Sequence, residues 1–301
     1  MTRLFCLVSL LFLLICPQIS AQSGDVLKQK IEQIISTKKA VVGVSVADGN
    51  KKEILSIHGD RHFPLQSVFK FHIALAVLSQ IDQGRFSLDQ KIKIEKKDLL
   101  PDLYSPIRDQ YPHGATLKLS EILEYTVSQS DNVGCDLLLR LIGGPQVVDA
   151  YFKKNNIKDI SIKLTEEVQQ ANWDLQFENW TTPNAANEVL SQFYDNKKKL
   201  LSKKSYDFIW ETMKATKTGA ARLKGELPAN SIIAHKTGTS GANKAGVAEA
   251  VNDIGVVFLP NGKHYFISVF VSKSTENSET NEKIIADISK ATWDFFKSQD
   301  K

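Results

Sequence analysis

The sequence predicts an α/β fold of the α+β type, with one antiparallel sheet of about five strands, flanking helices and an inserted all-α domain. Runs rich in β-branched and aromatic residues lie near both ends of the chain, and the long middle segment has helical periodicity instead. We therefore expect both chain ends to build one sheet. The expected boundaries are 1–21 for a signal segment, 22–64 and 215–301 for the sheet domain, and 65–214 for the all-α domain.

The N-terminal elements follow from local patterns. A helical period over 25–35 precedes two strand-like runs at 40–46 and 53–58, which the turn residues Asp48-Gly49-Asn50 separate, so a helix and then a hairpin are predicted. A nearly all-apolar helix is predicted over 68–81, with Gly84 ending it.

Five more helices are predicted in the middle of the chain, at 120–127, 132–142, 145–152, 183–194 and 205–213. Thr182 is the expected N-cap of the fourth, with Pro183 at its first position. The polar stretch 163–182 has no periodicity, and a loop of that length in a compact domain is usually functional.

The C-terminal part returns to strands at 231–239, 253–259 and 264–272, the last two joined by a Pro260-Asn261-Gly262 turn. The final helix repeats Ile284, Ile288, Ala291 and Phe295 at helical spacing, which predicts one buried face.

Composition excludes several classes of function. Residues 1–21 have the Arg3, apolar run and small-residue ending of a secretory signal, and that run is shorter than the ~20 residues that span a bilayer. A lipid anchor on Cys16 is an alternative, although Ile15 is larger than a lipoprotein box prefers. The net charge of +4 gives no reason to expect nucleic acid as a partner.

The cysteines and histidines predict neither a disulfide nor a metal site. Of three cysteines, Cys6 and Cys16 lie in the signal segment, and Cys135 stands in an apolar run where it is expected to be buried. The six histidines have no metal-ligand spacing, so we expect no metal and no other cofactor.

Ser67-Val-Phe-Lys70 places a hydroxyl and an amine one helical turn apart at the start of the apolar helix. A serine becomes a strong nucleophile when a nearby base takes its proton, and a desolvated amine can do so. The same pattern occurs at Ser36-x-x-Lys39 and Ser298-x-x-Lys301, but only Ser67 opens a long apolar helix.

Two further motifs follow in order. Ser130-Asp131-Asn132 lies between two predicted helices, where a helix N-cap is an equally good interpretation. Lys236-Thr237-Gly238 lies on a predicted strand, where Gly238 would let a ligand approach the backbone. Lys217-Thr218-Gly219 repeats that motif past a helix end and is interpreted as a turn.

With these three motifs in this order, most of the chain after residue 21 resembles the class A serine β-lactamases, and in particular their divergent extended-spectrum branch. The resemblance implies a β-lactamase/D,D-peptidase-like fold and hydrolysis of penicillins and cephalosporins, which confers antibiotic resistance. It also implies a small-molecule β-lactam as the only partner, a periplasmic monomer, and no membrane attachment after signal cleavage.

The resemblance assigns roles by position. Ser67 would be acylated, Lys70 would accept or relay its proton, and Ser130 would protonate the leaving nitrogen. Asn132, Lys236, Thr237 and Gly238 would bind substrate, and the N–H groups of Ser67 and Thr239 would form the oxyanion hole. Tyr104 resembles an aromatic gate, although an ordinary exposed tyrosine is nearly as good an interpretation.

Glu166 occupies the place of the family's deacylation base, with Glu167 beside it as the alternative register. The chain has Gln170 where the family usually has an Asn, and Leu164 and Asn179 where an Arg–Asp pair clamps the loop. These departures predict a roomier site that hydrolyses bulky cephalosporins. Arg222 is the candidate cation for the substrate carboxylate, or else it supports the adjacent loop.

Other functions remain possible from the motifs. A penicillin-binding D,D-peptidase shares the nucleophile machinery, and a serine glutaminase has a similar fold. A noncatalytic β-lactam sensor domain belongs to a different class, but sensors are tethered to a membrane segment. Whether Lys70 or Glu166 is the acylation base also stays open.

Overall fold

A computed structural model describes residues 18–299 of the chain. Most of the predicted signal segment, residues 1–17, lies outside them, as do Cys6 and Cys16. Within the described part no helix combines the length and the apolar character that crossing a bilayer requires.

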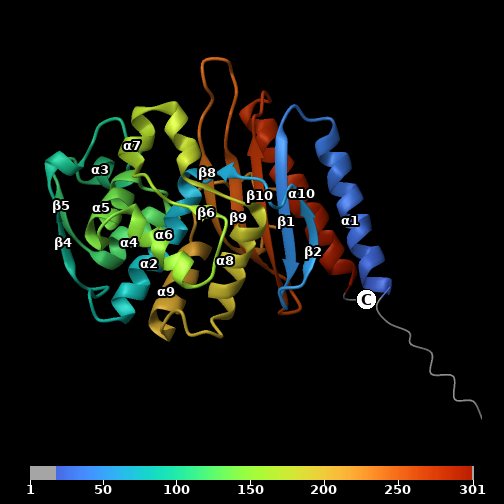
Figure 1. Cartoon of the computed structure of the whole chain (residues 1–301), viewed down its shortest axis with the longest axis horizontal. Helices are drawn as coiled ribbons and strands as arrows, with labels where there is room; N and C mark the ends of the chain where they lie inside the picture. The colour runs from blue at the N-terminus through green and yellow to red at the C-terminus, as the bar shows by residue number, and fades with distance from the viewer. Residues whose placement is uncertain (1–17, 300–301) are drawn as a thin grey trace, which may run out of the picture.

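One five-stranded antiparallel sheet joins the two ends of the chain, which confirms the predicted fold class (Figure 1). Its order is β2 (Glu53–Ile57), β1 (Val41–Asp48), β10 (His264–Ser272), β9 (Val251–Phe258) and β8 (Ile232–Thr239). β1 pairs with β10 without a register shift along its whole length. β8 is therefore the edge strand of the sheet.

Helices cover both faces of this sheet. α1 (Gln18–Ser36) and α10 (Ser278–Ser298) lie against one face, and α8 (Pro183–Asp195) lies on the other with the helical part of the chain (Figure 1). Alternate side chains of β10 enter the two cores. Ile267 packs toward α1 and α10, and Phe266 packs toward the helical part. Burial on both faces explains why the C-terminal strands read as apolar runs.

α2 (Phe69–Asp82) is the central helix of the helical part, and nearly all of its residues are buried. The predicted helices around it are confirmed, with ends that differ by at most two residues, as α4 (Leu119–Ser128), α5 (Asn132–Ile142), α6 (Pro145–Lys154) and α9 (Lys203–Lys214). Gly84 has a φ of 77° just past the end of α2, as a helix-ending glycine requires.

The sequence patterns missed the shortest elements, because two to six residues are too few to show a period. These are β3 (Phe63–Pro64), β4 (Lys91–Ile94), β5 (Ala115–Lys118), β6 (Ile160–Ser161), β7 (Trp180–Thr181), α3 (Pro106–Gln110), α7 (Glu166–Ala171) and the 3-10 helices η1 (Gln66–Val68), η2 (Lys96–Asp98) and η3 (Trp173–Glu178). The stretch 163–182, predicted as a loop without periodicity, therefore contains α7, η3 and β7.

His72 on α2 is fully buried, and its Nε2 has no hydrogen-bond partner among the residues described here. Burial lowers the pKa of His72 to about 4, although a hydrogen bond between Nδ1 and the Val68 carbonyl, which accepts, acts to raise it. The unfolded chain binds this proton near pH 6.5, so stability is lost as the pH falls from about 6.5 toward 4.

Replacing His72 with leucine should remove that part of the pH dependence. Between pH 7 and pH 4.5 we expect the free energy of unfolding of the wild type to fall by about 2–3 kcal/mol more than that of His72→Leu. Urea titrations at both pH values measure this difference, and His113→Gln, at an exposed position, is the matched control. Equal pH dependence in wild type and His72→Leu would contradict the prediction.

Candidate active site

Ser67 lies in η1, immediately before α2, so the hydroxyl stands at the entrance of the central helix. The backbone of this turn is held from two sides. Asn252 Nδ2 of β9 donates to the Pro64 carbonyl (2.8 Å), and Leu65 N donates to the Asn179 carbonyl (2.9 Å). Gln66 has a φ of 45°, a conformation that non-glycine residues rarely adopt and that the surrounding bonds must maintain.

Lys70 is completely buried, and its ammonium joins the predicted groups. Nζ lies 2.8 Å from Ser67 Oγ, 2.8 Å from the Ser130 carbonyl and 2.8 Å from Glu166 Oε1, and it also donates to Asn132 Oδ1. An ammonium has three protons for these four oxygens. A proton can therefore be exchanged along a short path between the Ser67 hydroxyl and the Glu166 carboxylate.

The segment 130–132 combines both interpretations of its motif. Asp131 is the N-cap of α5 and accepts from Gly134 N (2.7 Å), as a capping residue does. Ser130 has a φ of 62°, and its Oγ accepts from Lys236 Nζ (3.0 Å), whereas Asn132 faces Lys70. The cap thus holds two neighbouring side chains toward two lysines.

Lys236 on β8 is fully buried, with Nζ donating to Ser130 Oγ and to the Thr237 carbonyl (2.9 Å). Burial lowers the pKa of Lys236 well below its usual value, and the nearby charge of Lys70 lowers it further. A Cβ on Gly238 would lie 2.5 Å from the Leu65 carbonyl oxygen, so only glycine allows β8 to pack this closely on the Ser67 turn.

Glu166 begins α7, and only 7% of its surface is exposed. Thr165 caps α7 through Val168 N, and the Asp136 carboxylate accepts from Glu166 N (2.8 Å) and Glu167 N (2.9 Å). With these bonds in place the Glu166 side chain faces Lys70, and the Glu167 side chain is exposed. Burial raises the pKa of Asp136 to about 6.

Known proteins match the chain along nearly its whole length. A sequence model described as the β-lactamase enzyme family matches residues 26–296. The β-lactamase VEB-1 of Pseudomonas aeruginosa is 53% identical over 97% of both chains. The crystal structure of a representative of class A β-lactamase from Bacteroides cellulosilyticus is 40% identical, covers 92% of this chain and 99% of that one, and has a TM-score of 0.88. The chain belongs to the class A serine β-lactamases.

Two other relatives carry the extended-spectrum description in their names. The extended-spectrum β-lactamase PER-1 of Pseudomonas aeruginosa is 42% identical over 92% of this chain and 89% of its own. The crystal structure of the TLA-1 extended-spectrum β-lactamase is 48% identical, covers 91% of this chain and 99% of that one, and has a TM-score of 0.88.

In this β-lactamase a buried amide holds the loop over the site. Asn179 Oδ1 accepts from Lys163 N (2.7 Å) and Leu164 N (3.0 Å), and its Nδ2 donates to the Leu164 carbonyl (2.9 Å). The Asn179 side chain has no exposed surface. Neutral backbone bonds therefore take the place of the ion pair that most of the family is expected to have.

A cavity of about 190 Å³ lies between this loop and the Ser67 turn of the β-lactamase. It is lined by Gln66, Glu166, Gln169, Gln170, Trp173, Gln176 and Ser240. Gln66 Nε2 donates to Gln176 Oε1 (2.9 Å), which ties the turn to η3. Gln170 is exposed, and it reaches the same cavity as Glu166.

The remaining predicted residues are less closely engaged. Tyr104 has 56% of its surface exposed, and its carbonyl accepts from Asn132 N (3.0 Å). Thr237 Oγ1 lies 2.6 Å from Thr218 Oγ1, so the second Lys-Thr-Gly copy, interpreted as a turn, packs directly behind the first.

Arg222 is buried in the β-lactamase, with 6% of its surface exposed. Its guanidinium pairs with Glu282 (3.1 Å) and donates to the Gly238 carbonyl (3.1 Å), the Asn252 carbonyl (3.0 Å) and Thr239 Oγ1 (2.8 Å). These contacts favour a role for Arg222 in supporting β8. Through Thr239, which is exposed, Arg222 also contacts the end of that strand.

Sequence reasoning missed the groups that position the predicted ones. Asp136 and Asn252 bind backbone rather than each other, so no motif records them, and the role of Asn179, whose position was noted as a departure from the family, was not predicted. Asp136 did carry a signal, because an acid inside the apolar run of α5 must find buried partners.

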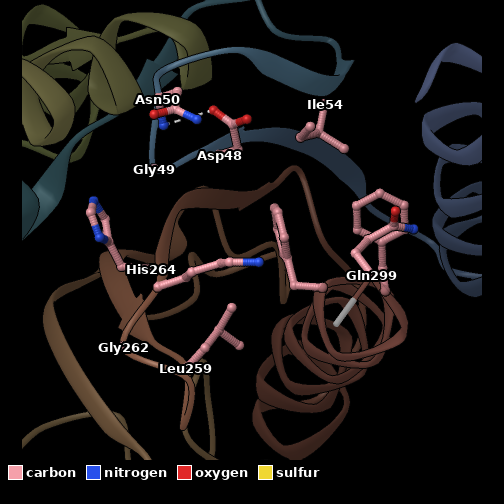
Figure 2. Close-up of a pocket in the computed structure, with 11 residues that line it drawn as sticks. Asp48, Gly49, Asn50, Ile54, Leu259, Gly262, His264 and Gln299 are labelled. Carbon is pink, nitrogen blue, oxygen red and sulfur yellow. Dashed lines mark hydrogen bonds between the residues drawn. The ribbon is translucent and has the colours of Figure 1, made fainter. Parts of the chain in front are cut away.

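A second cavity, of about 510 Å³, lies away from these residues (Figure 2). It opens between the β1–β2 turn at Gly49, the β9–β10 turn at Gly262 and the end of α10 at Gln299. None of the predicted site residues lines it.

Proposed function

We propose that this class A β-lactamase opens the β-lactam ring of penicillins and cephalosporins through an acyl-enzyme on Ser67, and that Glu166 delivers the water that releases it. The supporting observation is the Lys70 ammonium, which lies 2.8 Å from both the Ser67 hydroxyl and the Glu166 carboxylate. The proposed nucleophile and deacylation base therefore both contact the buried Lys70 ammonium, the proposed proton relay, and we call this cluster of Ser67, Lys70 and Glu166 the junction.

In the acylation step, Ser67 Oγ bonds to the lactam carbonyl carbon and loses its proton by one of two routes. Lys70 would first give a proton to Glu166 and then, as the neutral amine, accept the serine proton, or that proton would pass through water directly to Glu166. The N–H groups of Ser67 and Thr239 would stabilise the oxyanion. When the ring C–N bond breaks, Ser130 would give its proton to the nitrogen, and the 3.0 Å bond from Lys236 supports this transfer. Asn132 would bind the substrate's side-chain amide.

In the deacylation step, Glu166 would take a proton from a water that attacks the ester carbonyl, and Ser67 would leave as the alcohol. Asp136 and the cap at Thr165 hold Glu166 at the start of α7, facing Lys70. Gln170, which lines the same cavity, is the candidate partner for that water.

We propose that bulky oxyimino-cephalosporins are among the substrates. The loop is clamped by Asn179 and Asp136, and the glutamine-lined cavity lies beside Glu166. PER-1 and TLA-1, which resemble this chain over most of its length, are named extended-spectrum enzymes. Lys236 and Thr237 would bind the carboxylate that penicillins and cephalosporins share, with Arg222 supporting this strand.

Turnover by the purified protein tests this substrate range. We expect rapid hydrolysis of benzylpenicillin and, within about tenfold in kcat/KM, of an oxyimino-cephalosporin, because each tenfold corresponds to only 1.4 kcal/mol of transition-state binding. Absorbance measures the rates, and mass spectra show whether the protein returns to its free mass. A persistent adduct on Ser67 would favour a D,D-peptidase. Negligible turnover of the oxyimino-cephalosporin would contradict the proposed extended substrate range.

We also propose that the enzyme is exported to the periplasm and works there as a monomer. The N-terminal pattern of residues 1–21 supports export. The monomer is what the resemblance to the class A family implies.

A further inference from the structure

A buried histidine–carboxylate pair lies on the face of the sheet opposite to the Lys236 side chain. His235 Nδ1 lies 2.9 and 3.0 Å from the two carboxylate oxygens of Asp253 on β9. The exposed fractions of these side chains are 5% and 0%. Leu223 N also donates to Asp253 (3.3 Å), so the carboxylate joins β8, β9 and the turn before them. The mechanism proposed above uses neither residue.

The pair and Lys236 lie on opposite faces of the same strand. Asp253 is the register partner of Thr237, and side chains alternate along β8, so His235 and Thr237 share one face. Lys236 points to the other face, where it meets Ser130. The carboxylate of Asp253 is therefore separated from the lysine by one strand of dry protein, where charges act more strongly than in water.

Lys236 needs a negative charge nearby, because a fully buried ammonium without one loses its proton. The charged groups that act on it are Lys70 on α2, Glu166 on α7, Asp253 on β9 and Arg222 before β8. Burial and the two cations lower the pKa of Lys236, and the two carboxylates raise it. Glu166 already pairs with Lys70 at 2.8 Å, whereas Asp253 pairs with His235 rather than with a lysine or arginine in the part of the chain that the structure describes.

We propose that Asp253 is a positioning residue that keeps Lys236 charged for the substrate carboxylate, and that His235 holds the Asp253 carboxylate in place on the opposite face of the sheet. The inference rests on the proposed role of Lys236. It extends the carboxylate site by a layer of residues that never touch the substrate.

Asp253→Asn separates charge from structure, because asparagine keeps the size and one acceptor oxygen for His235 or Leu223. The assay compares a cephalosporin with the same compound carrying its carboxylate as a methyl ester. For the acid we expect kcat/KM to fall at least tenfold, mostly through KM, and for the ester less than twofold. Asp89→Asn is the control, since it removes an exposed charge paired with Lys118 and should change neither.

If Asp253 had a purely structural role, Asp253→Asn would lower kcat/KM for the acid and for the ester equally, and that result overturns the inference. If the variant does not fold, as thermal melting will show, His235→Leu and His235→Gln replace it. The leucine variant should lose activity on the acid at least threefold more than on the ester, and glutamine, which can still donate to Asp253, should restore it. Equal losses, or no rescue, again overturn the inference.

The wild type separates this inference from the proposed function. If the wild type turns over acid and ester equally, Lys236 does not recognise the carboxylate, and the proposed role of Lys236 fails together with that of Asp253. If it prefers the acid and Asp253→Asn keeps that preference, only the inference about Asp253 fails.

Discussion

Ser67→Ala is expected to lower kcat for nitrocefin by about 10⁶-fold, the size of effect that removal of a serine nucleophile has in other hydrolases. No other hydroxyl in this junction stands at the same point relative to Lys70. Ser130 meets Lys70 through its carbonyl and offers its Oγ to Lys236. The substitution therefore removes the only route to an ester while the lysine stays in place.

The fold of Ser67→Ala should be unchanged, because Lys70 keeps its contacts with Glu166, Asn132 and the Ser130 carbonyl. Ser36→Ala is the matched control, since Ser36 has a lysine at the same spacing but is exposed and donates only within α1. Nitrocefin rates and thermal melts check both variants. Residual turnover above about 10⁻³ of wild type in Ser67→Ala would assign the nucleophile elsewhere.

Glu166→Gln is expected to stop the cycle at the acyl-enzyme. Loss of a general base typically costs roughly 10²- to 10⁴-fold, and this loss should fall on deacylation. Glutamine can still accept from Lys70, so the junction keeps its geometry while losing the base. After benzylpenicillin is added, the protein mass should rise by the mass of one intact penicillin and stay there.

Glu167→Gln should behave like wild type, because Glu167 is exposed and only its backbone N–H enters the site, through Asp136. Mass spectra of both variants over time provide the measurement. Rapid return of Glu166→Gln to its free mass, or a trapped adduct in Glu167→Gln, would reverse the assignment. A Glu166→Gln protein that never acylates would instead make Glu166 the acylation base.

The fold was largely predictable, because its signals are local and repeated. The apolar run that became α2 and the Thr182-Pro183 start of α8 each carry their own period or cap. The elements that were missed, such as α7 and β7, are too short for a period and exist because tertiary bonds hold them. Asp136, for example, satisfies the first N–H groups of α7.

The residues of the candidate site that belong to motifs were also predictable, but the roles of the residues around them were not. Order and spacing singled out Ser67, Lys70, Ser130 and Lys236, and the chain brings all four together. The role of Arg222 was not predictable, because two roles fit one position in the sequence. Its burial against the Gly238 and Asn252 carbonyls is what favours support of the strand.

The sequence by itself determined the class of protein and the chemical groups at its centre, because motifs on helices and strands need only local spacing to be recognised. Tertiary structure alone decided which glutamate faces Lys70, what clamps the loop, and what charge lies behind Lys236. Those choices depend on contacts that range from 15 positions apart, for Asn179 and Leu164, to the ion pair that joins Lys70 to Glu166 across the helices between them. No local pattern encodes such a contact, because it forms only when separate helices, strands and loops pack together.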